Sequence, residues 1–317
     1  MNYDIFNGDA DGITSLLQLH LENPITSKKI TGVKRDTALI KKIRPKPGDN
    51  VRVLDIGLDK NFNEIKKILE KEVNVFYADH HKCKKLLSYE NLSMHLKTDK
   101  NYCTSLIISE LLDKKFHLWA IVGAFGDNLI EKANYESKIM NLSVEEYNQL
   151  RSLGFILNYN SYGKNLKDLL IHPASLFNLL LKFENPFEVF AKKDSIYYQI
   201  KSQYLSDIKN LSFEEVIYEN SHCKVIELPN ESWSRRVIGP YCNRLCNSDR
   251  ERAHAVIIKN DDETYMVSIR SSSQYFKRAS EIAVRFGGGG RELAAGIDNL
   301  IDKTDFVRSF SEYFSIS

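Results

Sequence analysis

The sequence predicts an α/β protein with an N-terminal parallel-sheet domain, a helical connector and a smaller C-terminal α/β domain. Buried-type strands alternate with an amphipathic helix in the first third, helix-forming residues dominate the middle, and a second alternation starts near Cys223. We expect the three parts to span residues 1–133, 134–222 and 223–317. A chain of 317 residues is long enough to bury two cores.

A βαβ unit is predicted in the first part. Residues 51–54 and 73–78 are two short apolar strands, and residues 61–71 have the period of an amphipathic helix. The apolar face of this helix carries Phe62, Ile65, Ile68 and Leu69. Because such crossovers join parallel strands, both strands end at the same edge of the sheet, where ligands bind in open α/β folds.

Acidic and imidazole side chains follow four apolar runs, each interpreted as a strand that ends at this edge. The runs are residues 3–6, 51–54, 73–78 and 121–126, and the side chains that follow them are Asp9, Asp11, Asp55, Asp79, His80, His81 and Asp127. Any one of these residues is as easily a helix cap or a satisfied core histidine. Their coincidence at strand ends predicts a single cluster.

A cluster of five carboxylates and a histidine requires cations, because the acids repel one another when they converge. The number of acids suits two divalent ions that share a bridging carboxylate. Mixed Asp and His ligation favours Mn²⁺, with Mg²⁺ as the alternative, and fits Zn²⁺ or Co²⁺ less well. The sequence therefore predicts a two-metal site.

The remaining two thirds of the chain consist of a middle part without recognisable motifs and a C-terminal part that contains one. Residues 134–222 are interpreted as mainly helical, a connector and lid candidate of unknown role. After them the pattern predicts a strand at residues 224–228 and a helix at 232–246. A hairpin of strands 255–259 and 264–270 and a helix at 278–286 are predicted to follow.

A run of four glycines follows the last of these helices. Gly287, Gly288, Gly289 and Gly290 let the backbone approach a ligand closely and expose N–H groups to an anion. Glycines alone would favour a plain flexible loop, but Arg291 and Arg270 flank the run. Because a guanidinium group binds phosphate in bidentate fashion, we expect an anion site here.

Composition limits the class of protein. The net charge of +2 argues against a protein that coats long nucleic acid, although ten of the fourteen arginines lie within residues 223–317. Five cysteines without paired spacing predict reduced thiols. No segment has the length of a membrane span and the start lacks a signal peptide, so we expect a cytoplasmic protein with no membrane partner.

Five motifs resemble those of the DHH phosphoesterase superfamily, in the branch that has the DHH-associated C-terminal domain. They are FNGDADGITS at 6–15, VLDIG at 53–57, YADHH at 77–81, GAFGDN at 123–128 and FGGGGRELAAG at 286–296. They occur in the family's order and leave only the middle third of the chain unmatched. RecJ exonucleases and NrnA nanoRNases belong to this branch.

The resemblance implies a role for each matched residue. The implied metal ligands are Asp9, Asp11, Asp55, His80 and Asp127, with Asp55 as the bridge. Asp79 would orient His80, and His81 would face the scissile phosphate. The C-terminal domain would bind substrate through Arg270, Arg291 and the glycines 287–290.

Two positions depart from the family pattern. Asn7 stands where many members have a histidine or an aspartate, which weakens one expected metal ligand. Arg291 stands where relatives commonly have a histidine, and arginine holds phosphate but relays no proton at neutral pH.

The resulting hypothesis is a metal-dependent phosphoesterase that hydrolyses short oligonucleotides or nucleoside bisphosphates with water activated by two metal ions. The alternatives within the enzyme class are a RecJ-like single-strand exonuclease and a linear or cyclic dinucleotide phosphodiesterase. A catalytically silent nucleotide-binding protein is the alternative outside it. Long duplex nucleic acid is not an expected partner.

Overall fold

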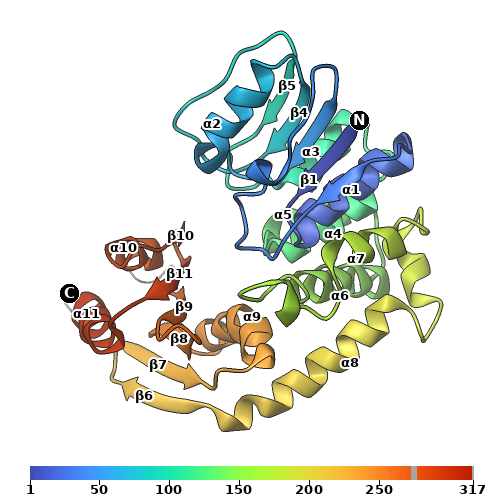
Figure 1. Cartoon of the computed structure of the whole chain (residues 1–317). Helices are drawn as coiled ribbons and strands as arrows, with labels where there is room; N and C mark the ends of the chain where they lie inside the picture. The colour runs from blue at the N-terminus through green and yellow to red at the C-terminus, as the bar shows by residue number, and fades with distance from the viewer. Residues whose placement is uncertain (273–276, 316–317) are drawn as a thin grey trace. The chain divides into compact units, whose positions relative to one another are not determined.

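The computed structural model describes residues 1–272 and 277–315. They form two compact units, Met1–Gln203 (unit 1) and Tyr204–Ser317 (unit 2). The chain passes from one to the other within helix α8 (Ile196–Lys209), which Figure 1 shows in yellow. Unit 1 thus includes most of the expected connector, and the three-part division expected from the sequence stays a prediction.

Unit 1, whose residues are all described, is built on a five-stranded parallel sheet (Figure 1). The strand order is β2-β1-β3-β4-β5. The strands are β1 (Asn2–Phe6), β2 (Lys28–Ile30), β3 (Asn50–Leu54), β4 (Asn74–Asp79) and β5 (Leu92–Leu96). The predicted βαβ unit is confirmed, and the residues that follow β1, β3 and β4 leave the sheet at one edge.

Helices pack around this sheet and fill most of the region between residues 104 and 203. The helical prediction covered residues 134–222 and is confirmed for the part of unit 1 that lies in this range. The helices are α1 (Ala10–Glu22), α2 (Leu58–Leu69), α3 (Thr104–Leu111), α4 (His117–Gly126), α5 (Ile130–Ile139), α6 (Val144–Tyr159) and α7 (Pro173–Leu180). Short 3-10 turns are η1 (Ile40–Lys42), η2 (Leu166–Asp168) and η3 (Pro186–Phe190).

The prediction of a strand at residues 121–126 is wrong, because these residues form the second half of α4. Almost every side chain of this helix is buried, so it lacks the polar face by which a helix is recognised in a sequence. Glycines permit the close packing: a Cβ added at Gly126 would lie 2.2 Å from the Cβ of Ala10 in α1, and one at Gly123 would lie 2.2 Å from the Oγ of Ser105 in α3.

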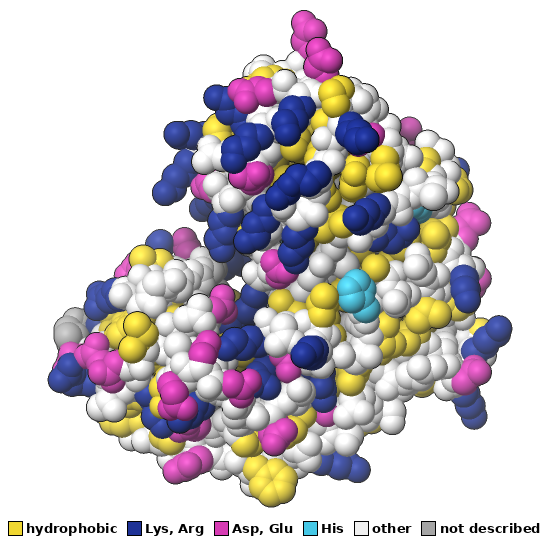
Figure 2. All heavy atoms as spheres, viewed as in Figure 1, with side chains coloured by type: hydrophobic (Ala, Val, Ile, Leu, Met, Phe, Trp, Pro, Cys, Tyr) yellow, Lys and Arg dark blue, Asp and Glu magenta, His cyan; other side chains and the backbone are white. Residues whose placement is uncertain are grey.

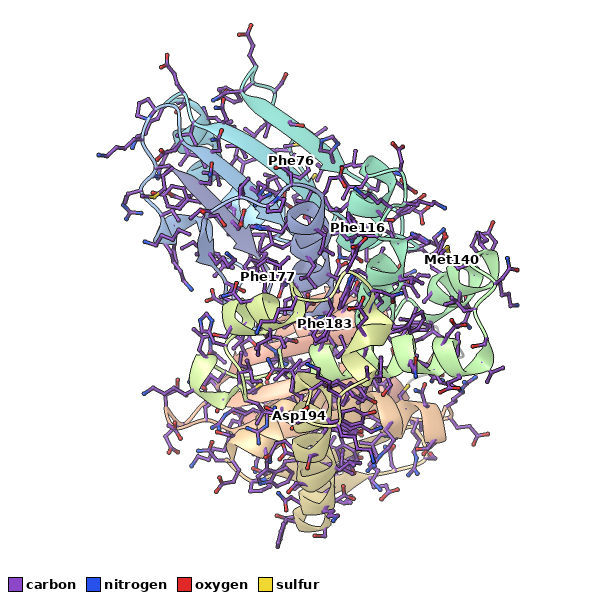
Figure 3. The ribbon with its side chains drawn as sticks, turned by 90° about the vertical axis from the view of Figure 1, so that its right-hand side faces the viewer. Phe76, Phe116, Met140, Phe177, Phe183 and Asp194 are labelled. Atoms are coloured by element: carbon purple, nitrogen blue, oxygen red, sulfur yellow. The ribbon has the colours of Figure 1, made fainter. Side chains whose placement is uncertain are left out.

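Phe177 joins α7 to the sheet and to α1. Its ring lies 6.2 Å from that of Phe6 at the end of β1 and 5.1 Å from that of His20 in α1, measured between centroids. Figure 3 labels Phe177 at this junction, between the sheet and the helices that follow it. A helix more than 150 residues from β1 in the sequence therefore supports the first strand of the sheet.

The described part of unit 2 forms a six-stranded mixed sheet in the order β10-β11-β9-β8-β7-β6. Its strands are β6 (Glu215–Glu219), β7 (Cys223–Leu228), β8 (Ala253–Lys259), β9 (Tyr265–Arg270), β10 (Gly289–Arg291) and β11 (Ala294–Leu300). The helical elements are η4 (Asn210–Phe213), α9 (Ser232–Ser248), α10 (Ala279–Arg285) and α11 (Lys303–Ser315). The predicted hairpin is confirmed, since β8 and β9 pair antiparallel.

The glycine run is only partly a loop. Gly289 and Gly290 belong to β10, which pairs with β11. Gly287 and Gly290 have φ angles of +76° and +148°, in the region that favours glycine. The run therefore forms a turn with a defined backbone conformation that leads into the edge strand β10.

Within the described residues, no helix combines the length and the apolar character needed to span a membrane.

Candidate metal centre

Asp9 and Asp11 are fixed at the start of α1. Asp9 is the N-cap of this helix and accepts a hydrogen bond at Oδ1 from the backbone N–H of Gly12, 3.1 Å away. Asp11 lies in the first turn and is 1% exposed. The helix starts at Ala10 because Asp9 caps it.

Asp55 follows β3 in a strained conformation. Its φ is 57°, a left-handed value that costs a residue other than glycine about 1 kcal/mol or more. The backbone N–H of Asp55 donates to the carbonyl of Ala78 at the end of β4, 3.0 Å away. This bond holds the carboxylate of Asp55 next to the residues that follow β4.

His80 brings the separate acids together. Its Nε2 lies 3.4 Å from Asp55 Oδ1, 3.7 Å from Asp127 Oδ2 and 4.0 Å from Asp11 Oδ2. Asp127 arrives from the C-terminus of α4 and not from a strand, yet it reaches the expected place. We call His80, Asp11, Asp55 and Asp127 the His80 set.

Asp11 also anchors α3. Its two carboxylate oxygens accept the backbone N–H groups of Thr104 and Ser105, at 2.8 and 2.7 Å, where that helix begins. The hydroxyl of Thr104 lies 3.4 Å from Asp55 Oδ1, within reach for a hydrogen bond. No sequence signal predicts these contacts, because more than 90 residues separate Asp11 from α3.

The acids raise one another's pKa. Burial raises the pKa of Asp55 well above its usual range, and the charges of Asp9 and Asp11 raise it further. Burial also raises the pKa of Asp11 against the opposite effect of His80, and the charges of Asp127 and Asp9 raise it as well. A divalent cation removes this repulsion, so the electrostatics of the cluster fit a metal.

Asp79 pairs with His81 and not with His80, which corrects the role expected for this carboxylate. His81 Nδ1 lies 2.7 Å from Asp79 Oδ1, and the imidazole of His81 is 44% exposed while Asp79 is buried. The second oxygen of Asp79 is buried and makes no hydrogen bond within the described residues. Asp55, Asp79, His80 and His81 also present ligand atoms within 4.8 Å of one another. An orphaned buried carboxylate oxygen beside such a group further fits a cation.

The position of Lys34 was not predicted from the sequence. It lies after β2, and its Nζ forms an ion pair with Asp9 Oδ2, lies 3.6 Å from Asp127 Oδ1 and donates to Asn158 Oδ1 at 3.2 Å. Burial acts to lower the pKa of Lys34, but the charges of Asp9 and Asp127 outweigh burial and raise it. A single lysine in a loop carries no pattern by which the sequence reveals this position.

The expected anion-binding residues all lie in unit 2. Arg270 in β9 and Arg291 in β10 both pair with Ala294 of β11, which lies between them in the sheet. The guanidinium of Arg270 donates to Asn243 Oδ1 at 2.5 Å and to Ser268 Oγ at 3.2 Å, so its position is fixed by α9 and β9. Two cationic side chains beside the glycine turn make a basic end of the sheet.

Comparison with known proteins identifies the second unit. Residues 220–315 match the family model of the DHHA1 domain. No curated protein sequence matches the chain significantly. The expected resemblance is thus carried at sequence level by unit 2.

Solved structures share the fold of the whole chain. Exonuclease RecJ bound to manganese aligns with a TM-score of 0.60 and 15% identity over 99% of this chain and 89% of its own. An exopolyphosphatase-related protein from Bacteroides fragilis aligns with a TM-score of 0.54 and 16% identity over 99% and 91% of the two chains. The pGpG-specific phosphodiesterase PggH from Vibrio cholerae aligns with a TM-score of 0.52 and 11% identity over 97% and 96%.

Proposed function

This chain carries a DHHA1 domain and has the fold of the DHH superfamily, and from this premise we propose that it is a divalent-metal-dependent phosphoesterase. Its proposed substrates are short oligonucleotides or nucleoside bisphosphates. The observation that carries the proposal is the His80 set, in which one imidazole nitrogen lies within 4.0 Å of three carboxylates from separate elements.

The proposed ligands are Asp9, Asp11, Asp55, His80 and Asp127, and Mn²⁺ is the proposed ion, with Mg²⁺ as the alternative. Ions bound there would lower the pKa of a water molecule and polarise a phosphoryl oxygen. The share of the protein is to hold the carboxylates in place: Gly12 fixes Asp9, the N-terminus of α3 fixes Asp11, and the backbone of β4 fixes Asp55.

We assign proton transfer to His81. Because its Nδ1 is engaged by Asp79, its Nε2 remains available to donate a proton to the phosphate or to the leaving oxygen. Burial acts to lower the pKa of His81, but the hydrogen bond and charge of Asp79 raise it, which favours the proton-donating form. Asp79 is a positioning residue for this imidazole.

Substrate recognition is proposed to use both charged regions. Arg270, Arg291 and the glycines 287–290 would bind a phosphate that is not cleaved. In unit 1, Lys82, Lys84 and Lys85 are exposed directly after the DHH triplet. Figure 2 shows many lysine and arginine side chains on the visible face of unit 1. Both features favour a short anionic substrate.

A dinucleotide phosphodiesterase is the second candidate, since the fold also matches that of the pGpG-specific enzyme. A RecJ-like exonuclease remains the third, and a cytoplasmic location is part of the same proposal. The test is a panel of substrates: RNA and DNA oligomers from dimers upward, adenosine bisphosphate, and linear and cyclic dinucleotides, each incubated with Mn²⁺. We expect the fastest turnover on the shortest oligomers or on the bisphosphate. Hydrolysis of none of them would contradict the proposed function.

A further inference from the structure

The acids of the metal centre divide into two groups with different partners. In the His80 set, the ligand atoms of Asp11, His80 and Asp127 lie within 4.8 Å of one another, and His80 Nε2 also lies 3.4 Å from Asp55 Oδ1. Asp9 lies outside it: Oδ1 accepts the N–H of Gly12, and Oδ2 is paired with Lys34. Asp9 is therefore paired with a protein cation, whereas the two oxygens of Asp11 accept backbone N–H groups.

Asp127 is shared between the two groups. Its Oδ2 lies 3.7 Å from His80 Nε2, whereas its Oδ1 lies 3.6 Å from Lys34 Nζ. The ammonium group thus occupies the space between Asp9 and Asp127, where a second divalent ion would bind both. We call this space the Asp9 position.

Hydrogen bonds hold both the backbone and the side chain of Lys34 in this place. Asn7 accepts the N–H of Asp9 at its Oδ1 and donates from its Nδ2 to the carbonyl of Lys34, each at 3.3 Å. The N–H of Lys34 donates to the carbonyl of Ser161 at 2.9 Å, and Asn158 accepts from Nζ. Asn7 thus links the backbone of Asp9 to the backbone of Lys34.

We propose that Lys34 is a built-in cation at the Asp9 position, so that a divalent ion enters this position only by displacing the lysine, whereas the His80 set binds an ion tightly without this competition. The inference rests on the proposed function only in treating the His80 set as a metal site. An ion that enters the Asp9 position must break a charge-assisted contact of Lys34 with Asp9 and weaken another with Asp127. A contact of this class changes an equilibrium constant by roughly 10- to 100-fold.

The experiment titrates Mn²⁺ into the full chain, without substrate, after a chelator has removed any bound metal. Binding is measured by calorimetry and by the electron spin resonance signal of free Mn²⁺. The wild-type protein should bind one ion tightly and a second at least roughly 10-fold more weakly. Lys34→Met removes the charge but keeps the length of the side chain, and it should strengthen the second site by roughly 10- to 100-fold. Lys34→Arg keeps the charge and should leave that site weak.

Two matched pairs sharpen the result. Asp11→Asn should abolish tight binding, whereas Asp9→Asn, two residues away, should leave it unchanged. Lys41→Met, at an exposed lysine on η1, should behave as the wild type. If Lys34→Met does not fold, Asn158→Ala releases Lys34 from α6 and should strengthen the second site by a smaller factor.

Two equally tight ions in the wild-type protein, or a Lys34→Met variant whose second site is unchanged or weaker, would overturn the inference. Loss of tight binding in Asp9→Asn would overturn it as well. These readouts are separate from the proposed function, because they follow binding and not hydrolysis. A protein that binds Mn²⁺ in the predicted pattern but hydrolyses no phosphoester would retain the inference about Lys34 and lose the proposed activity.

Discussion

The carboxylate of Asp4 links strands β1 and β3, which lead into the metal centre, and its removal should destabilise unit 1. Asp4 is fully buried in β1. Its Oδ1 accepts from Arg52 Nε of β3 at 2.6 Å, and its Oδ2 lies 2.7 Å from His20 Nε2 of α1 and also accepts from Ser27. The change Asp4→Asn keeps the shape of the side chain and removes its charge.

The pKa of Asp4 sets the size of the effect. Burial acts to raise this pKa, but hydrogen bonds from His20 and Arg52 outweigh burial and lower it from 3.8 to about 2. A difference of this size corresponds to about 2 kcal/mol of stability at neutral pH. Leaving the buried partners without a charge adds to this cost, so we expect Asp4→Asn to lose roughly 2–4 kcal/mol.

The pH dependence gives the direction of the test. Because the folded pKa of Asp4 lies below the unfolded value, its contribution is present above about pH 4 and is lost as the pH falls toward 2. Urea unfolding of the wild type and of Asp4→Asn should differ most at pH 7 and converge in acid. Asp194→Asn, at an exposed aspartate of unit 1, serves as a control with little effect. Equal stability of Asp4→Asn and wild type at pH 7, or a difference that persists at pH 2, would refute the reasoning.

Three further outcomes are expected. Turnover should be fastest on oligomers of about two to five nucleotides with a shallow salt dependence, since few phosphates are neutralised, whereas processive degradation of long single strands with a steep slope would favour the RecJ-like alternative. Arg270→Ala and Arg291→Ala should each lose roughly 10- to 1000-fold in kcat/KM on a nucleotide but little on a small aryl phosphodiester. His81→Ala should lose activity on both substrates, and Arg308→Ala should keep activity on both. Equal losses of the two arginine variants on both substrates would contradict the assigned recognition role. Gly126→Ala should cost roughly 1–3 kcal/mol in thermal unfolding, because its Cβ would meet Ala10 at 2.2 Å, and an unchanged melting temperature would contradict the described packing of α4 on α1.

The strands β1, β3 and β4 were predictable because they are largely buried and have short apolar runs, with an amphipathic helix between the last two. The edge strands β2 and β5 are partly exposed and were not predicted. The same logic failed for α4. A helix buried on every side has no polar stripe, so residues 121–126 resemble a buried strand. Asp127, which follows this helix, nevertheless lies 3.7 Å from His80 Nε2, and its role as a metal ligand stays a prediction.

Pairing within the cluster was less accessible to sequence reasoning. The sequence identified Asp79 as a positioning carboxylate but assigned it to His80, whereas the hydrogen bond is with His81. Lys34 gave no signal at all, because its role depends on folding a loop after β2 against α4 and α6. The departure at Asn7 was visible in the sequence, but its two hydrogen bonds to the backbone were not.

The central claim is that the carboxylates around His80 make a metal-dependent phosphoesterase. The most direct measurement is hydrolysis of a generic aryl phosphodiester by the full chain, with Mn²⁺, with chelator, and in the variant Asp55→Ala. The account predicts turnover with Mn²⁺, none with chelator, and none for Asp55→Ala, although this variant should stay folded because the change also relieves repulsion among the acids. Turnover at the wild-type rate in the presence of chelator, or in folded Asp55→Ala, would contradict it.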